Sequence, residues 1–304
     1  MVSVVGLGCN NFGRAGSATE DLAGTVAVLD AAIDAGVTLL DTADVYGGDG
    51  TSERFMGEAL DGRREQVVIA TKFGHAEIEM GILPGVPKGS RDYVLTALEG
   101  SMRRLRTDVI DLYQLHTPDP ATPIGETIEV LEALRLEGRI RAYGASQFPS
   151  ALMREAAVAA AAIGAQGFVS AQDEYSLLAR GVEVDRLPAA RELGMGFLPF
   201  FPLANGLLTG KFTRVARPAD TRIARQRPHV ADDAPWDTME AYAAWCARRG
   251  VSMLEATVGW LLAQPGLSSV IAGATTAAQV RANAAAGAWV PTDDDVAAIS
   301  AIFA

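Results

Sequence analysis

The chain has 304 residues, 49% of them apolar, and it carries a formal net charge of −11. This length fits two average domains or one α/β barrel, and the negative charge predicts that neither nucleic acid nor an anionic membrane surface is a partner. The two cysteines, Cys9 and Cys246, are too few and too isolated for a disulfide framework or a zinc site, so no metal is expected. The start of the chain lacks a basic leader and no apolar run approaches the ~20 residues of a membrane span, which predicts a cytoplasmic protein without a membrane partner.

Apolar periodicity predicts helices and strands in alternation along the chain. Helices are expected near residues 26–33, 55–60, 94–105, 124–134, 151–163, 187–193 and 254–262, and from about 276 onward. Strands are expected near residues 37–43, 66–73, 109–116, 140–147, 168–172, 195–201 and 268–274. This alternation indicates parallel strands joined by crossover helices, in about eight units, although a doubly wound sheet would show the same pattern.

No linker or change of composition divides the chain, so residues 1–304 are expected to form a single domain. Two segments, 75–88 and 212–237, are too long to be simple connections. Long ordered loops on such a scaffold often cover a site, and these two are expected to shape one.

Polar side chains occur where successive predicted strands end. They are Asp41, Lys72, His116, Ser146 with Gln147, and Gln172. Taken singly, each has an ordinary explanation as a turn cap, a solvated charge or a hydrogen-bonded core residue. In a parallel barrel, however, all these strand ends meet on one face, which is where active sites lie. Their recurrence therefore indicates a catalytic site.

Tyr46 follows Asp41 by five residues and supplies a phenol to the same rim. Lysine is rare in this chain, which contains only Lys72, Lys88 and Lys211, so a lysine at a strand end needs a chemical reason. An ammonium about 4 Å from the phenol is worth about 4 kcal/mol at an effective dielectric constant of about 20, which predicts a Tyr46 pKa lowered by about three units. Asp41 would keep Lys72 charged, and a neutral His116 would donate a hydrogen bond. This set is suited to protonating an oxygen during reduction of a small carbonyl substrate.

A reduction also needs a hydride source. The segment GLGCNNFG departs from the Rossmann fingerprint, because Asn11 stands where the third glycine belongs. The segment SSVIAGATTAAQVRANAAA is more informative, since its strand runs through Gly273 and Ala274 into a helix whose first N–H groups can bind phosphate. Asn283, deeper in that helix, is a candidate contact for a base.

Taken together, these segments resemble those of the aldo-keto reductases, and the resemblance covers nearly the whole length of the chain. The matching segments are GLGCNNFG, LLDTADVYG, ATKFG, DLYQLHTPD, GRIRAYGAS, QDEYSLLAR, PFFPLANGLLTGKF and VIAGATTAAQVRAN. The resemblance implies a (β/α)8 TIM barrel that binds NADP(H) at its C-terminal face. It also implies Tyr46 as general acid, Lys72 and Asp41 as the groups that tune it, and His116 as the residue that orients the carbonyl.

The resemblance further implies a cofactor-binding set with two residues near the start of the chain and the rest between residues 146 and 283. The implied residues are Gly8, Cys9, Ser146, Gln147, Gln172, Phe200, Pro202, Leu203, Gly206, Leu208, Lys211, Gly273, Ala274, Thr275, Gln279 and Asn283.

Three positions depart from the family pattern. Gln147 replaces the usual Asn, Phe200 replaces the common Tyr under the nicotinamide, and Thr275 stands where many relatives carry a basic residue for the 2′-phosphate. NADP is therefore expected with NAD possible, and Arg281 or Arg222 would have to compensate at the phosphate.

Two other functions remain open on the sequence. One is a cofactor-binding regulatory subunit resembling the potassium-channel β-subunits, which would keep the same four residues. The other is a Schiff-base aldolase or dehydratase with Lys72 as nucleophile, which needs a neutral lysine. The sequence does not indicate the physiological substrate or the oligomeric state.

Overall fold

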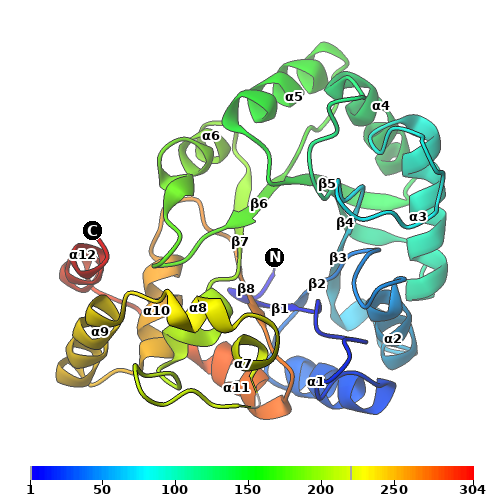
Figure 1. Cartoon of the computed structure of the whole chain (residues 1–304). Helices are drawn as coiled ribbons and strands as arrows, with labels where there is room; N and C mark the ends of the chain where they lie inside the picture. Colours follow the sequence, from blue (N-terminus) through cyan, green and yellow to red (C-terminus); the bar gives the residue numbers. More distant parts are fainter. Residues whose placement is uncertain (1, 220) are drawn as a thin grey trace.

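A computed structural model describes residues 2–219 and 221–304, without the side chain of Arg222, and contains one eight-stranded parallel sheet curled into a nearly closed barrel (Figure 1). The strands are β1 (Val5–Gly8), β2 (Leu39–Asp41), β3 (Val68–Phe73), β4 (Ile110–Leu115), β5 (Ile140–Ser146), β6 (Ser170–Glu174), β7 (Gly196–Phe200) and β8 (Val270–Gly273). Their order is β7-β6-β5-β4-β3-β2-β1-β8. The seam between β7 and the segment before β8 is joined where Phe197 donates to the Gly266 carbonyl at 2.9 Å.

The helices surround the strands, as Figure 1 shows. Those that follow the strands are α1 (Leu22–Asp34), α2 (Thr51–Ala59), α3 (Arg91–Leu105), α4 (Ile124–Leu136), α5 (Ser150–Ala162), α6 (Arg186–Glu192), α10 (Met253–Leu262) and α11 (Ala277–Ala286). Additional helices are α7 (Arg222–Gln226), α8 (Pro228–Asp232), α9 (Trp236–Arg249) and α12 (Asp293–Ile302), with short 3-10 helices η1 (Arg64–Gln66), η2 (Gly181–Glu183) and η3 (Ala204–Thr209). In the described part of the chain, no helix combines the length and apolarity needed to cross a bilayer.

The predicted (β/α)8 barrel is confirmed, and each predicted strand overlaps an observed one. Asp41 ends a strand as predicted, but this strand is the second, because β1 precedes it and was not predicted. β1 spans only four residues, two of them glycines, so it offers little periodicity. Helices α9 and α12 were also not predicted. The long segment 212–237 contains α7 and α8, whereas 75–88 contains no helix or strand.

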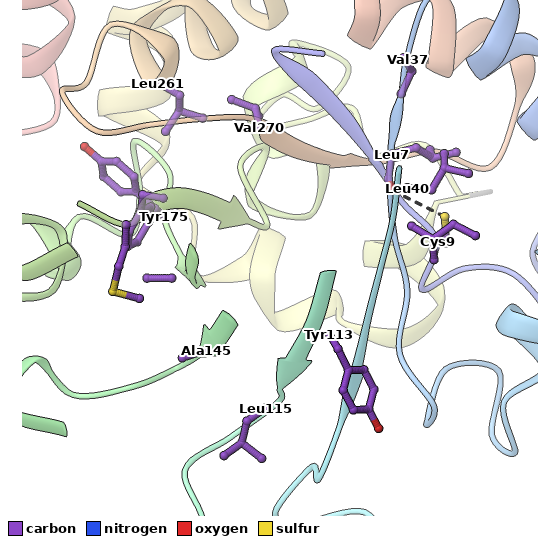
Figure 2. Packing of buried hydrophobic residues seen from close by; sticks show 14 of the residues in the cluster. Leu7, Cys9, Val37, Leu40, Tyr113, Leu115, Ala145, Tyr175, Leu261 and Val270 are labelled. Carbon is purple, nitrogen blue, oxygen red and sulfur yellow. Dashed lines mark hydrogen bonds between the residues drawn. The ribbon is translucent and has the colours of Figure 1, made fainter. Parts of the chain in front are cut away.

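The alternation of side chains along each strand decides which residues reach the barrel interior. On β3, Ile69 and Phe73 pack in the large cluster between sheet and helices, part of which Figure 2 shows, whereas Ala70 packs in the small inner cluster. Lys72 has the same parity as Ala70 and therefore points inward. The same rule holds for the residues two positions after inward Leu39, Leu112 and Leu198. These are Asp41, Gln114 and Phe200.

A second group of polar side chains is buried on the outer side of β3 and β4, under α2 and α3. Glu53 accepts from Thr71 Oγ1 at 2.5 Å and from Arg104 Nε at 2.7 Å. Asp44 is fully buried, and neither of its carboxylate oxygens has a partner among the described residues. Burial, and then the negative charge of Glu53, raise the pKa of Asp44 to about 7. The Asp44 carboxyl therefore binds its proton more tightly in the folded chain than in the unfolded chain.

The raised pKa of Asp44 makes the stability of the protein depend on pH. Because the folded state holds the Asp44 proton more tightly, its stability falls as pH rises from about 4 to about 7 and stays lower above that range. We expect Asp44→Asn to stabilise the protein more at pH 8 than at pH 5, by about 2–3 kcal/mol on the scale of 1.4 kcal/mol per pKa unit. Urea denaturation of both proteins at the two pH values measures this, with the exposed Asp61→Asn as control. An equal difference at both pH values would contradict the assignment.

Candidate active site

The centre of the inward-facing set is an ion pair between β2 and β3. Lys72 Nζ donates to Asp41 Oδ2 at 2.7 Å and to the Thr42 carbonyl at 2.9 Å. The exposed fractions of Lys72 and Asp41 are 0% and 3%. Burial alone would lower the pKa of Lys72, but the Asp41 carboxylate and the Tyr46 phenol outweigh it, and the pKa is raised. The lysine is therefore a buried, permanent cation.

Tyr46 lies against this cation. Lys72 Nζ is hydrogen-bonded to the Tyr46 hydroxyl and lies 5.2 Å from the centroid of its ring. The expected net lowering of the Tyr46 pKa is wrong. Burial raises this pKa and Asp41 adds to the rise, so that Lys72, which acts downward as expected, does not prevail. The free phenol is thus a firmly protonated donor beside an ammonium that can stabilise its anion.

His116 completes the group at the end of β4. Its ring meets that of Tyr46 edge-on with centroids 5.8 Å apart, and that of His75 edge-on at 4.7 Å. Burial, the Lys72 cation and His75 together lower the pKa of His116 well below its ordinary value. The imidazole is therefore neutral, as the sequence analysis required. Its Nδ1 is buried and has no partner among the described residues.

The other oxygen of Asp41 is held by an amide network that the sequence analysis only partly found. Gln172 Nε2 donates to Asp41 Oδ1 at 2.9 Å and lies 3.5 Å from Gln114 Oε1. Gln172, which the sequence analysis assigned to cofactor binding, thus also orients Asp41. Gln114 was missed, although its parity with Leu112 and His116 marks it as inward-facing.

Ser146 and Gln147 lie beside this network at the end of β5. Ser146 is buried. Gln147 adopts a left-handed backbone with φ of 61°, its N–H donates to the Gln172 carbonyl at 2.8 Å, and its Nε2 donates to the His116 carbonyl at 3.3 Å. Asparagine adopts this backbone more readily than glutamine, so Gln147 is an uncommon residue for this conformation.

The loop after β7 has an unusual backbone. Left-handed φ angles occur at Phe201 (50°), Ala204 (46°), Asn205 (58°) and Gly206 (103°), and the Asn205 side-chain oxygen is buried with no partner among the described residues. Strained conformations of this kind are concentrated at functional sites, and consecutive N–H groups in such turns form anion-binding concavities. The predicted contacts in and around this loop are half-buried Phe200, with Pro202, Leu203, Gly206, Leu208 and Lys211. Leu203 and Leu208 bury their side chains in the core, so only their backbones can face a ligand.

The end of β8 and the start of α11 form the far side of the rim. Thr275 gives both its N–H and its hydroxyl to Gln279 Oε1, at 2.8 and 3.2 Å. Asn283 is largely buried, and its Nδ2 lies 3.4 Å from the Gly273 carbonyl. Ala274 is buried between them. The Thr275 donors are thus already used by Gln279, and the side chain of Arg222 lies outside the described residues.

Gly8 and Cys9 lie at the end of β1, next to Asp41. Gly8 pairs with Asp41 on one side and Gly273 on the other. The Cys9 N–H donates to the Asp41 carbonyl at 2.8 Å, and its thiol is 3.6 Å from the Leu7 carbonyl (Figure 2). Burial and the Asp41 charge raise the pKa of Cys9, so the thiol is not a nucleophile at neutral pH. Among the described residues, no group of three or more His, Cys, Asp or Glu side chains is arranged to hold a metal ion.

The segment 75–88 is held over the β3 end by Lys88. Its ammonium donates to the carbonyls of His75 at 2.6 Å, Ala76 at 3.3 Å and Ile78 at 3.0 Å, and pairs with Glu79 at 2.8 Å. The sequence analysis gave Lys88 no role. Its function is to fix the loop that brings His75 against His116.

Comparison with known proteins identifies the family of this chain. The family model described as the aldo/keto reductase family matches residues 4–304. The uncharacterized oxidoreductase YrpG of Bacillus subtilis is 35% identical, over 92% of this chain and 86% of its own length. A probable voltage-gated potassium channel subunit beta of Oryza sativa is 33% identical (84% and 80%), and the aldo-keto reductase YhdN of B. subtilis is 32% identical (99% and 90%). The chain belongs to the aldo/keto reductase family and resembles its oxidoreductases.

Proposed function

We propose that the protein reduces an aldehyde or ketone to an alcohol with a hydride from NADPH or NADH. The observation that carries this proposal is the buried Lys72–Asp41 pair in contact with the Tyr46 hydroxyl, next to the neutral imidazole of His116. A phenol that can give up a proton and a neutral N–H donor then converge on one oxygen. Reduction of a carbonyl needs both, because negative charge develops on that oxygen.

Each residue has a definite role in this proposal. Tyr46 donates the proton, and its raised pKa keeps it protonated at neutral pH before the reaction. Lys72 stabilises the tyrosinate left behind, while Asp41 keeps the lysine charged and oriented. Gln172 fixes Asp41 in turn. His116 donates from its Nε2 to the substrate oxygen, which aligns the carbonyl before the proton moves.

The second half of the rim fits a nicotinamide dinucleotide. When bound, this cofactor supplies the hydride. In this proposal Ser146 and Gln172 hold its carboxamide, and the ring of Phe200 lies under the nicotinamide. The backbone N–H groups of the left-handed loop after β7, together with the Lys211 cation, are suited to the pyrophosphate. Gly273, Gln279 and Asn283 are assigned to the adenosine end. Because Thr275 is committed to Gln279, we propose that selection for the 2′-phosphate is weak and that NADH is also accepted.

The two alternative functions, a Schiff-base enzyme and a regulatory subunit, are not equally supported. A Schiff base at Lys72 is disfavoured, since the raised pKa of this lysine keeps it protonated and non-nucleophilic. A cofactor-binding regulatory role is supported by the similarity to a probable potassium channel β-subunit. The two functions share the cofactor site and differ in turnover.

Turnover of a simple aldehyde separates these functions. We expect the protein to oxidise NADPH or NADH in the presence of 4-nitrobenzaldehyde, and Tyr46→Phe to reduce kcat by at least about 100-fold, because general acid catalysis contributes about 10²–10⁴-fold. Loss of absorbance at 340 nm measures the rate. Wild-type turnover no higher than that of the variant would contradict the enzymatic proposal and favour the regulatory one.

Removing the cation tests the role of Lys72. We expect Lys72→Met to lower kcat by about 1,000-fold, because roughly 4 kcal/mol of tyrosinate stabilisation is lost, while NADPH still binds in a fluorescence titration. The variant leaves Asp41 buried and unpaired, so the double variant Lys72→Met/Asp41→Asn is the folding control. A near-normal rate in either protein would refute the assignment.

Cofactor preference tests the position of Thr275. We expect Thr275→Arg to tighten NADPH binding relative to NADH. The substitution replaces the side chain that now contacts Gln279 with a cation that can pair with the 2′-phosphate. Fluorescence titration with both cofactors gives the two Kd values. If their ratio equals that of the wild type, Thr275 does not face the 2′-phosphate.

A further inference from the structure

Two loops far apart in sequence are tied together beside the mouth of the barrel. Arg225 of α7 donates through Nη1 to the Gly16 carbonyl at 2.5 Å, in the segment between β1 and α1. That segment is itself folded onto Asn11, whose carbonyl accepts from Ser17 Oγ at 3.1 Å and Thr19 Oγ1 at 2.9 Å. In Figure 1, α7 and α8 lie on the side of the barrel formed by β8 and β1. Each of the two loops places one more arginine near this junction.

The first of these is Arg14, in the β1–α1 segment. It is half-buried, and its Nη1 is fully buried with no hydrogen-bond partner among the described residues. Burial lowers the pKa of Arg14, the like charge of Arg227 lowers it further, and Tyr46 acts in the opposite direction. Arg14 therefore lies within electrostatic range of both a second cation and the proposed proton donor.

The second is Arg227, between α7 and α8. Its guanidinium carbon lies 5.5 Å from the centroid of the Phe201 ring, and Phe201 meets Phe200 edge-on at 5.3 Å. A carboxylate near Arg227 is that of Glu174, at the end of β6, but the two form no ion pair. Arg227 lowers the pKa of Glu174, whereas burial and Asp173 raise it and prevail. Arg227 is thus held above the aromatic pair at the end of β7.

Neither arginine forms an ion pair with a described carboxylate, although the chain has 37 acidic residues to draw on. Elsewhere in the structure such partners are common, as for Arg104 with Glu53 and Arg249 with Asp295. Two guanidinium groups that repel one another, one with a buried unsatisfied nitrogen, are costly to maintain in the absence of an anion. A ligand that brings negative oxygen atoms removes both costs.

We propose that Arg14 and Arg227 form an anion subsite beside Tyr46, and that its occupant is a carboxylate carried by the substrate. The preferred substrates are then carbonyl compounds with an acidic group at the end away from the reacting carbon. This inference rests on the proposed function. The pyrophosphate of the cofactor has the same anionic chemistry. Gly13 packs against Gly47 and Thr51, which brings the segment of Arg14 to that of Tyr46 and favours the substrate over the cofactor.

The test compares two substrates that differ in one charge. At saturating cofactor, kcat/KM is measured for 4-carboxybenzaldehyde and for its methyl ester with the wild type, Arg14→Met and Arg227→Met. We expect each substitution to lower kcat/KM for the acid by about tenfold or more, as for loss of a charge-assisted contact, and to leave that for the ester within about threefold. Unchanged turnover of the ester also shows that the variants are folded. Arg248→Met, on the exposed face of α9, is the matched control and should change neither.

Cofactor binding distinguishes the two sources of the anion. The Kd values for NADPH and NADH should be unchanged in both variants. Equal losses for acid and ester, with a weakened cofactor Kd, would assign the arginines to the pyrophosphate and overturn the proposal, as would variants with wild-type values for both substrates. If the wild type turns over neither substrate, the proposed function fails on its own. Calorimetric binding of 4-carboxybenzaldehyde to the NADP⁺-loaded protein, which needs no turnover, should still weaken about tenfold in Arg14→Met, and equal affinity would overturn the subsite.

Discussion

The ion pair between Lys72 and Asp41 is the interaction on which the arrangement of the barrel mouth depends. Both groups are almost completely withdrawn from water, and the cost of removing two charges from water is close to what their attraction returns. Such a pair adds little to stability compared with an apolar pair of the same size. Its value lies in keeping a cation fixed next to Tyr46, which no solvated lysine would do. The contacts of Asp41 with Gln172, and of Gln172 with Gln114, preserve that geometry.

The barrel supplies the constraint that brings these groups together. Residues two positions apart on a strand share a face, and parallel strands end on one side of the sheet. Each polar residue of the site therefore continues an apolar inward row: Asp41 follows Leu39, Lys72 follows Ala70, and Gln114 follows Leu112. A slip of one residue in β3 would put Thr71 or Phe73 into the site and leave no cation there.

Much of this was predictable, because the strands are apolar runs whose polar ends stand out. The alternation of strands and helices and the positions of Asp41, Lys72 and His116 at strand ends followed from that pattern, whereas the choice of a barrel over a doubly wound sheet came from the family resemblance. What could not be predicted depends on context. The four-residue β1 has too few residues to show a period, and the direction of the Tyr46 pKa depends on how burial compares with two opposite charges. The arginines at positions 14 and 227 gave no signal, since only the meeting of their loops makes them neighbours.

The loop after β3, residues 75–88, shows how the surroundings of the active site can vary in sequence while the barrel stays the same. Lys88 holds that loop through three main-chain carbonyls and one side chain, that of Glu79, so most of its contacts do not depend on which side chains the loop carries. Loop residues other than Glu79 and the left-handed Gly81 and Gly85 can therefore be exchanged while the turn beside His116 persists. Two parts of the fold therefore have separate roles. The strands keep the reacting groups in register, while the sequence of a loop that is held through its backbone can vary and change which substrates fit.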